Sequence, residues 1–430
     1  MQITNYPPKE QWSRLLERPV LDANSLETSV ANVLKEVKAS GDDALRRFTT
    51  MFDKVLVQEL TVGPEEIQAA AEQLSSELKE AIQTAKENIT RFHAAQLRQE
   101  EAVETMPGIR CWRKMVPIEK VGLYIPGGTA PLFSTLLMLG VPAQLAGSSE
   151  IILCTPPGKD GQIHPAILYT AQLTGITRIF KVGGAQAIGA MAYGTATIPK
   201  VYKIFGPGNQ YVTAAKQLVQ KEGVAIDMPA GPSEVCVLAD DSAQPAFVAA
   251  DLLSQAEHGA DSQVLLISTS EQLLEQTLSE LERQLQLLPR EEMARKALAN
   301  SKAILVSSYA EAIALSNEYA PEHLIISCSN AESLAEQVTN AGSVFIGNYS
   351  PESVGDYASG TNHTLPTNGY ARAYSGVSVD SFVKKITFQQ LSQEGLLNIA
   401  ATVEEMAEAE GLKAHAEAVR VRRRGIEDRR

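Results

Sequence analysis

Polar side chains that could bind a metal ion occur at spacings that a fold could bring together. The segment DLLSQAEHGAD puts Gln255 and His258 three residues apart near the C-terminal end of a predicted helix. Side chains at i and i+3 share a helix face, so an amide oxygen and an imidazole nitrogen could meet one cation. Asp356, in a long glycine-rich loop, and His415, on the last predicted helix, are candidates for further ligands, with His363 as a rival. The same spacing is also typical of an ordinary surface helix, where a histidine interacts favourably with the C-terminal dipole.

A carboxyl group and an imidazole stand side by side in Pro321-Glu322-His323, before the apolar strand LIIS. Proline biases the residue before it away from helix, which places the pair at a junction at the mouth of a strand. Neighbouring acid and base groups suit general acid–base catalysis, although an exposed loop pair would show the same pattern. Cys236, inside the apolar strand VCVLA, is typical of an inert core thiol, with covalent aldehyde oxidation through it as the alternative.

Three glycine turns fall within one predicted α/β unit: Pro126-Gly127-Gly128, Gly183-Gly184-Ala185-Gln186 and Gly206-Pro207-Gly208-Asn209. Glycine lets a pyrophosphate approach the backbone, and the positive end of a following helix favours its charge. None of the turns spells GxGxxG, and the strand EIILCTPP ends on Cys154 and Thr155 where a ribose-binding acid is expected. The turns therefore indicate either plain strand-to-helix geometry or a nucleotide bound in a non-standard way.

Composition limits the class of protein. The chain has 430 residues, enough for about three domains of ordinary size. Its formal charge of -13 repels phosphate backbones, which argues against a nucleic-acid partner. No secretory signal and no apolar run of about 18 residues is readable, so we expect no membrane partner and a cytoplasmic protein. The four cysteines form no CxxC pair, so a bound metal should use nitrogen and oxygen ligands.

Alternating strand and helix patterns predict α/β architecture with parallel sheets. After an arm over residues 1–22, the pattern is helical from 25 to about 101, and strands then alternate with helices up to Asp240. The same alternation restarts beyond Asp240 and predicts a second α/β domain. Residues 349–378 form a long aperiodic loop of the kind that lines sites, and the chain beyond Ser381 is predicted to be helical.

Several of these segments together resemble the histidinol dehydrogenase family. The resemblance rests on IDMPAGPSE (226–234), its continuation through VCVLAD to DLLSQAEHG, the YIPGG, GGAQAIGA and FGPGN turns, and APEHL. It spans most of the chain in order. The activity it implies is the NAD-dependent, zinc-dependent oxidation of L-histidinol through L-histidinal to L-histidine, which ends histidine biosynthesis.

The resemblance also implies roles for individual residues. The implied zinc ligands are Gln255, His258, Asp356 and His415. The implied acid–base pair is Glu322 and His323. The implied substrate contacts are Ser233, Gln255, His258, His323, Asp356, Glu410 and His415, and the implied NAD contacts are Tyr124, Gln186 and Asn209. In the implied mechanism, His323 is neutral near pH 7 and acts as the base in both oxidations, and Glu322 helps water to add to the aldehyde.

The implied fold has two Rossmann-like α/β domains, similar to aldehyde dehydrogenases, with helical N- and C-terminal extensions. After the N-terminal arm (1–22), residues 23–115 and 235–378 would form the α/β domain with the metal and catalytic residues, and residues 116–234 the NAD-binding domain. Residues 379–430 would form a helical tail that completes the site of the partner in a homodimer. The competing interpretations are an aldehyde dehydrogenase with Cys236 or Cys154 as nucleophile, a non-catalytic nucleotide-binding dimer, and, with less support, a zinc hydrolase, for which no HExxH motif is present.

Overall fold

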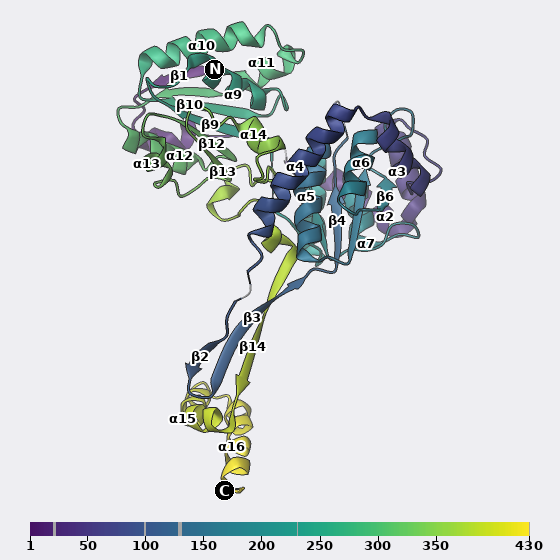
Figure 1. Ribbon diagram of the computed structural model, residues 1–430, viewed down its shortest axis with the longest axis vertical. Coiled ribbons are helices and arrows are strands. Elements are labelled where there is room, and N and C mark those ends of the chain that lie inside the picture. Colours follow the sequence, from purple (N-terminus) through teal and green to yellow (C-terminus); the bar gives the residue numbers. More distant parts are fainter. Residues whose placement is uncertain (20–22, 99, 128–130, 230, 430) are drawn as a thin grey trace. The chain divides into compact units, whose positions relative to one another are not determined.

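The computed structural model describes residues 1–19, 23–98, 100–127, 131–229 and 231–429, which form two compact units (Figure 1). The larger unit comprises Met1–Gln96 and Ile118–Phe382. The smaller unit comprises Leu97–Pro117 and Val383–Arg430. The larger unit contains two parallel sheets with helices on both faces, which confirms the predicted α/β class.

The first sheet of the larger unit has six parallel strands in the order β1-β11-β10-β9-β12-β13. Its strands are β1 (Gln2–Asn5), β9 (Glu234–Ala239), β10 (Gln263–Ser268), β11 (Lys302–Leu305), β12 (His323–Ser327) and β13 (Ser343–Ile346). The central strand β9 is buried along its whole length, as expected for a sheet covered on both faces. Val235 and Val237 face one apolar cluster, while Cys236 and Leu238 face the other.

Helices cover the two faces of this sheet. The cluster around Val235 is completed by α9 (Pro245–Ala256), α10 (Glu271–Leu285) and α11 (Glu291–Ala299). The opposite cluster is completed by α12 (Tyr309–Tyr319), α13 (Ala331–Ala335) and α1 (Trp12–Leu15). The N-terminal arm therefore belongs to this part of the fold, because β1 pairs with β11 and Trp12 is buried against α12.

The second sheet has five parallel strands in the order β6-β5-β4-β7-β8. Its strands are β4 (Lys120–Tyr124), β5 (Glu150–Thr155), β6 (Arg178–Lys181), β7 (Lys203–Phe205) and β8 (Ala225–Ile226). Its helices are α5 (Phe133–Ala146), α6 (Pro165–Leu173), α7 (Gly184–Tyr193) and α8 (Gln210–Lys221). The chain moves from β4 to β5 in one direction and to β7 in the other, so the sheet has the switch point at which α/β folds bind ligands.

The early helices pack on the second sheet, which differs from the domain division expected from the sequence. They are α2 (Ala23–Phe48), α3 (Pro64–Ala70) and α4 (Ser76–Ala94). Val30 and Leu34 of α2 share a cluster with Tyr124, and Ile82 and Ile89 of α4 pack against α5. The division predicted from the sequence places this segment with residues 235–378 instead. An apolar helix stripe fits either sheet, so chain order alone does not decide the partner.

The smaller unit joins a three-stranded antiparallel sheet to two helices. Its elements are β2 (Val103–Met106), β3 (Ile109–Pro117), β14 (Val383–Leu391), α15 (Gln393–Ala409) and α16 (Lys413–Glu427). The prediction that the chain is helical beyond Ser381 is therefore wrong for residues 383–391. These residues pair along their whole length with β3, and Phe388 stacks on Trp112 at 5.4 Å. The pairing partner lies some 270 positions earlier, where local patterns cannot reveal it.

Within the described residues, a search of the helices finds none with the length and apolar character needed to cross a membrane.

Candidate active site

A cavity of about 1020 Å³ in the larger unit holds most of the predicted site residues. His323 is the first residue of β12, so the acid–base pair lies at the amino end of the first sheet. Gln255 and His258 reach the same end, because α9 follows β9 and runs back antiparallel to it. Gly206 to Asn209, which follow β7, bring the carboxyl end of the second sheet to the cavity. In open α/β sheets, ligands usually bind at the carboxyl ends of the strands. Here only the second sheet presents this end to the cavity.

Glu322 and His323 are both buried, at 7 % and 3 % exposure, and both face the cavity. The Glu322 Oε2 atom accepts a hydrogen bond from the backbone N–H of Glu234 at 2.9 Å. The Nδ1 atom of His323 lies 3.2 Å from the Glu234 carbonyl oxygen, which can only accept a hydrogen bond. With a proton on Nδ1, the Nε2 atom is the one that points away from this contact and can exchange a proton with a substrate.

Two further carboxyl groups surround His323. Glu352 and Asp356 lie four residues apart on the short helix α14 (Glu352–Tyr357), so they share one face. The Glu352 Oε1 atom lies 3.8 Å from His323 Nδ1, and the Asp356 Oδ1 atom lies 3.3 Å from Nε2. Ligand atoms of these three residues all lie within 4.8 Å of one another. The sequence analysis did not single out Glu352, because it treated this segment as a loop. Pro351 followed directly by Glu352, with a second acid four residues later, is nevertheless a signal for the start of a helix.

These carboxyl groups control the protonation of the pair. Burial raises the pKa of Glu322 to about 8. Burial opposes a charge on the His323 imidazole, but the surrounding carboxylates, Glu352 first among them, outweigh it and raise the His323 pKa well above its ordinary value. In the chain alone, the direction of this shift favours the protonated imidazole, whereas the resemblance implies a neutral ring. A cation beside Asp356 would offset this effect.

Three of the four predicted zinc ligands line the cavity: Gln255, His258 and Asp356. Gln255 is 1 % exposed, and its Oε1 atom makes no hydrogen bond to any described atom. A buried amide oxygen without a hydrogen-bond partner destabilises the folded state unless a bound ligand or ion interacts with it. Its Nε2 atom donates to the Glu234 carbonyl at 3.3 Å, which leaves the amide oxygen free. With a proton on His323 Nδ1, the 3.0 Å between that atom and Gln255 Nε2 is a contact of two donors and not a hydrogen bond. The donor set of amide, imidazole and carboxylate therefore fits a zinc-type cation.

The other predicted substrate contacts and the other candidate zinc ligands do not all lie at this cavity. Ser233 lines the same cavity. Glu410 ends α15 and His415 lies in the first turn of α16, both exposed and both in the smaller unit. His363, the rival ligand, has its Nδ1 atom 2.7 Å from the Asp356 carbonyl oxygen of the same segment. Its other ring nitrogen lies 3.0 Å from Thr135 Oγ1.

The three predicted NAD contacts lie around the glycine turns. Tyr124, at the end of β4, accepts a hydrogen bond through its hydroxyl from the Gly184 N–H at 3.0 Å. Gln186, in the first turn of α7, is 1 % exposed, and neither of its amide atoms has a partner in the described part of the chain. Asn209 lines the cavity and caps α8 by accepting from the N–H groups of Tyr211 and Val212.

Packing explains two of the glycine turns. A Cβ atom at Gly127 or at Gly183 would lie within 2.5 Å of the Pro156 side chain, so both positions require glycine for steric reasons. Gly128, in the same predicted turn, lies outside the described residues. Plain strand-to-helix geometry thus accounts for these two glycines, and a phosphate-binding role is an additional hypothesis rather than their only explanation.

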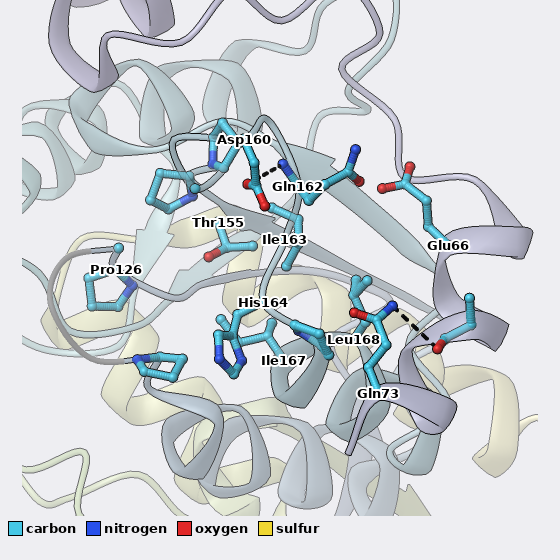
Figure 2. Close-up of a pocket in the computed structure, with 17 residues that line it drawn as sticks. Glu66, Gln73, Pro126, Thr155, Asp160, Gln162, Ile163, His164, Ile167 and Leu168 are labelled. Carbon is cyan, nitrogen blue, oxygen red and sulfur yellow. Dashed lines mark hydrogen bonds between the residues drawn. The ribbon is translucent and has the colours of Figure 1, made fainter.

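A second cavity, of about 390 Å³, lies beside the end of β5 (Figure 2). Thr155, where a ribose-binding acid is expected, is fully buried there, and its hydroxyl has no partner among the described atoms. Asp160 also lines this cavity, but its Oδ1 atom already accepts from the backbone N–H of Gln162 at 3.0 Å (Figure 2). His164, on the opposite side in the figure, caps α6 by accepting through Nδ1 from the backbone N–H of Ala166.

Neither candidate cysteine nucleophile is accessible. Cys236 and Cys154 are fully buried, and burial raises the pKa of Cys236 to about 12 and that of Cys154 further. Thiolates at low pKa in exposed positions are what covalent catalysis requires. The structure therefore disfavours an aldehyde dehydrogenase that acts through either thiol.

The predicted acid–base pair, three of the predicted metal ligands and the glycine-turn edge of a parallel sheet line one cavity of an α/β fold. Comparisons with known proteins specify the class of this protein as an oxidoreductase. The family model of histidinol dehydrogenase matches residues 16–423, and the chain belongs to this family. The identity predicted from the sequence is confirmed, and with it the function of this family, the last step of histidine biosynthesis.

Individual relatives agree over nearly the whole chain. The histidinol dehydrogenase of Bacteroides thetaiotaomicron is 62 % identical over 422 residues, which cover 98 % of this chain and 99 % of that protein. The enzyme of Escherichia coli K12 is 52 % identical over 416 residues, covering 96 % and 95 %. The crystal structure of histidinol dehydrogenase from Elizabethkingia anophelis matches with a TM-score of 0.97 and 58 % identity, and covers 99 % of both chains.

Proposed function

We propose that this chain oxidises L-histidinol to L-histidine in two NAD-dependent steps at one zinc-containing site. The observation that carries the proposal is the convergence of Gln255, His258 and Asp356 on the cavity that also holds Glu322 and His323. The unpaired Oε1 atom of the buried Gln255 amide supports a cation there. When bound, zinc supplies positive charge that orients the imidazole and amine of the substrate and lowers the pKa of the nearby His323.

In the first oxidation, His323 Nε2 takes the proton of the substrate hydroxyl while hydride leaves the carbinol carbon. Positioned bases of this kind contribute about 10²–10⁴-fold to a rate. The contact of Nδ1 with the Glu234 carbonyl fixes the ring so that Nε2 is the reacting nitrogen. Ser233, which lines the cavity, would hold a polar group of the substrate. When bound, NAD accepts the hydride of each oxidation.

In the second oxidation, Glu322 takes a proton from the water that adds to the aldehyde. Its pKa of about 8 makes this carboxyl basic enough to accept that proton while part of it is still ionised near neutral pH. As the water adds, His323 Nε2 gives its first proton to the aldehyde oxygen, which forms the hydrate and leaves the imidazole neutral. His323 Nε2 then takes a hydroxyl proton of the hydrate as the second hydride leaves, and the resulting carboxylic acid ionises. The product of this sequence is the carboxylate of histidine.

Tyr124, Gln186 and Asn209 would contact NAD. The support for this placement is the pair of unpartnered amide atoms of Gln186 at the start of α7, where the helix dipole favours a phosphate. The cavity of about 1020 Å³ is larger than an amino alcohol needs, so it has room for a nicotinamide beside the substrate.

We further propose a cytoplasmic homodimer in which Glu410 and His415 of the partner subunit complete each site. All four cysteines are free thiols, which suits a reducing compartment. His415 lies exposed at the start of α16, in a unit separate from the one that holds the other three ligands. A ligand supplied by a partner would explain why a terminal segment carries a site residue.

Metal removal tests the zinc component. Treatment with EDTA should abolish NADH formation, and added zinc should restore it. The Gln255→Ala variant should bind less than one zinc per chain after gel filtration, whereas Gln337→Ala, on an exposed surface of the same unit, should retain it. Full activity in a metal-free sample would refute the zinc site.

Subunit mixing tests the shared site. His258→Asn and His415→Asn should each be inactive alone. If His415 acts across the dimer, subunit exchange between the two variants creates one intact site per mixed dimer, and activity returns to about a quarter of the unmodified value. If His415 acts within its own chain, every mixed site lacks a ligand and activity stays absent.

A further inference from the structure

The backbone of Glu234, the first residue of β9, contacts three site residues at once. Its N–H donates to Glu322 Oε2 at 2.9 Å. Its carbonyl oxygen accepts from Gln255 Nε2 at 3.3 Å and lies 3.2 Å from His323 Nδ1. A shift of this one residue would therefore displace the acid, the base and a predicted zinc ligand together.

The side chain of Glu234 is held by the N-terminal arm. The Nε atom of Arg18 lies 2.5 Å from Glu234 Oε1, and Nη2 lies 2.9 Å from Oε2. The backbone N–H of Asn368 donates to the same Oε1 atom at 2.8 Å. The Glu234 side chain is only 3 % exposed and that of Arg18 only 16 %, so this bidentate ion pair is shielded from water. Such a fork fixes orientation as well as distance.

Arg18 is itself fixed from the other side. Its Nη2 atom also donates to the carbonyl oxygen of Tyr319 at 2.8 Å, and its guanidinium lies 4.0 Å from the centre of the Tyr319 ring. The Glu17 carbonyl next to it accepts from Gln263 Nε2 at 3.1 Å. The arm is thus anchored to β10 and α12, and the position of Arg18 is set before any substrate binds.

We propose that Arg18 is a positioning residue for this reaction, which fixes Glu234 and through it the orientations of Glu322 and His323. Arg18 touches none of the reacting groups named above. It acts because catalytic groups must be held to a fraction of an ångström, and a displacement of 1 Å by a distant substitution can cost about 10²-fold in rate. Lysine cannot replace it, since a single ammonium cannot span both carboxylate oxygens and the Tyr319 carbonyl.

The decisive variant is Arg18→Lys, which keeps the charge and removes the fork. We expect kcat to fall by about 10- to 100-fold, while KM for histidinol stays within about twofold. Arg14→Lys, on the exposed side of the same arm, is the matched control and should behave as the unmodified chain. A kcat for Arg18→Lys within twofold of the Arg14→Lys value would overturn the proposal.

A spectroscopic readout separates positioning from general stability. In protein labelled with 15N-histidine, the Nδ1 signal of His323 is assigned by its loss in His323→Asn. Arg18→Lys should shift or broaden this signal while the signal of His164, far along the chain on the cap of α6, stays in place. An unchanged His323 signal in a variant with low kcat would show that Arg18 acts in some other way, and would overturn the proposal.

If Arg18→Lys unfolds at the assay temperature, the double variant Arg18→Met/Glu234→Gln decides, because it removes both charges together, leaves no unpaired buried charge and still lacks the fork that fixes Glu234. Lowered kcat in the folded double variant supports the proposal, and unmodified kcat overturns it. The inference rests on the proposed roles of Glu322 and His323. Failure of those roles would appear as normal turnover in the Glu322 and His323 variants, whereas failure of the inference would appear only in the Arg18 variants.

Discussion

Replacement of Glu322 by glutamine should separate the two oxidations. The carboxyl is buried and its pKa is raised to about 8, so about one molecule in ten carries the ionised form at pH 7. If the ionised form activates water, the rate of aldehyde oxidation rises nearly tenfold per pH unit below pH 8 and levels off above it. Glutamine has no basic oxygen of this kind, so aldehyde oxidation should fall by about 10²–10⁴-fold and lose this pH dependence.

The alcohol oxidation is the internal control for this variant. It uses His323 as base, so it should change by less than about tenfold in Glu322→Gln. Glutamine still offers an oxygen to the Glu234 N–H, which keeps the local hydrogen bond. Single-turnover measurements of NADH absorbance between pH 6 and 9, started with histidinol or with histidinal, give both rates.

The fold should survive this change. A carboxyl whose pKa is raised on folding costs stability once it ionises, so the cost is absent below its ordinary pKa and complete above pH 8. Glu322→Gln removes that cost, and its unfolding temperature at pH 8 should be no lower than that of the unmodified chain. Equal loss of both oxidations, or a pH dependence of the aldehyde step that persists in the variant, would refute the assigned role.

Three further substitutions test other parts of the site. His323→Asn should lower both oxidations by at least about 10²-fold and keep its zinc, as measured by NADH formation and metal analysis; loss of zinc in step with activity would contradict a role as base. Gln186→Ala should raise KM for NAD on the order of tenfold and leave KM for histidinol unchanged, and an unchanged KM for NAD would limit Gln186 to packing. Asn209→Ala should lower the free energy of unfolding by about 0.5–2 kcal/mol, because it removes the cap of α8, in addition to raising KM for NAD; denaturant titration checks the first effect and steady-state kinetics the second.

Local geometry explains why several of the predicted site residues line one cavity. Gln255 and His258 lie three apart at the end of α9, and a helix that follows a strand must return to the strand's amino end. His323 begins β12 beside β9, so the same geometry brings the acid–base pair to these ligands. The alternation of strands and helices predicted parallel sheets, which are covered on both faces, and β9 is buried throughout.

Other features depend on contacts that no local pattern encodes. The ion pair of Arg18 with Glu234 joins residues 216 positions apart, and nothing near either residue indicates the partner. The residues 383–391 contain Lys384 and the polar pair Gln389 and Gln390, so their alternation is weak, and only pairing with β3 makes them a strand. Protonation is also partly non-local, because burial opposes a charge on His323 while Glu352, Glu322 and Asp356 raise its pKa, and two of these three belong to another element.

The central claim is that a single site carries out two successive oxidations of one substrate. The direct measurement is the number of NADH molecules formed per molecule of histidine when zinc-loaded protein is given limiting histidinol and excess NAD. Two NADH per histidine, with no free histidinal detected by an aldehyde-trapping reagent, is the predicted result. One NADH per histidinol consumed, with aldehyde released and no histidine, would contradict the account.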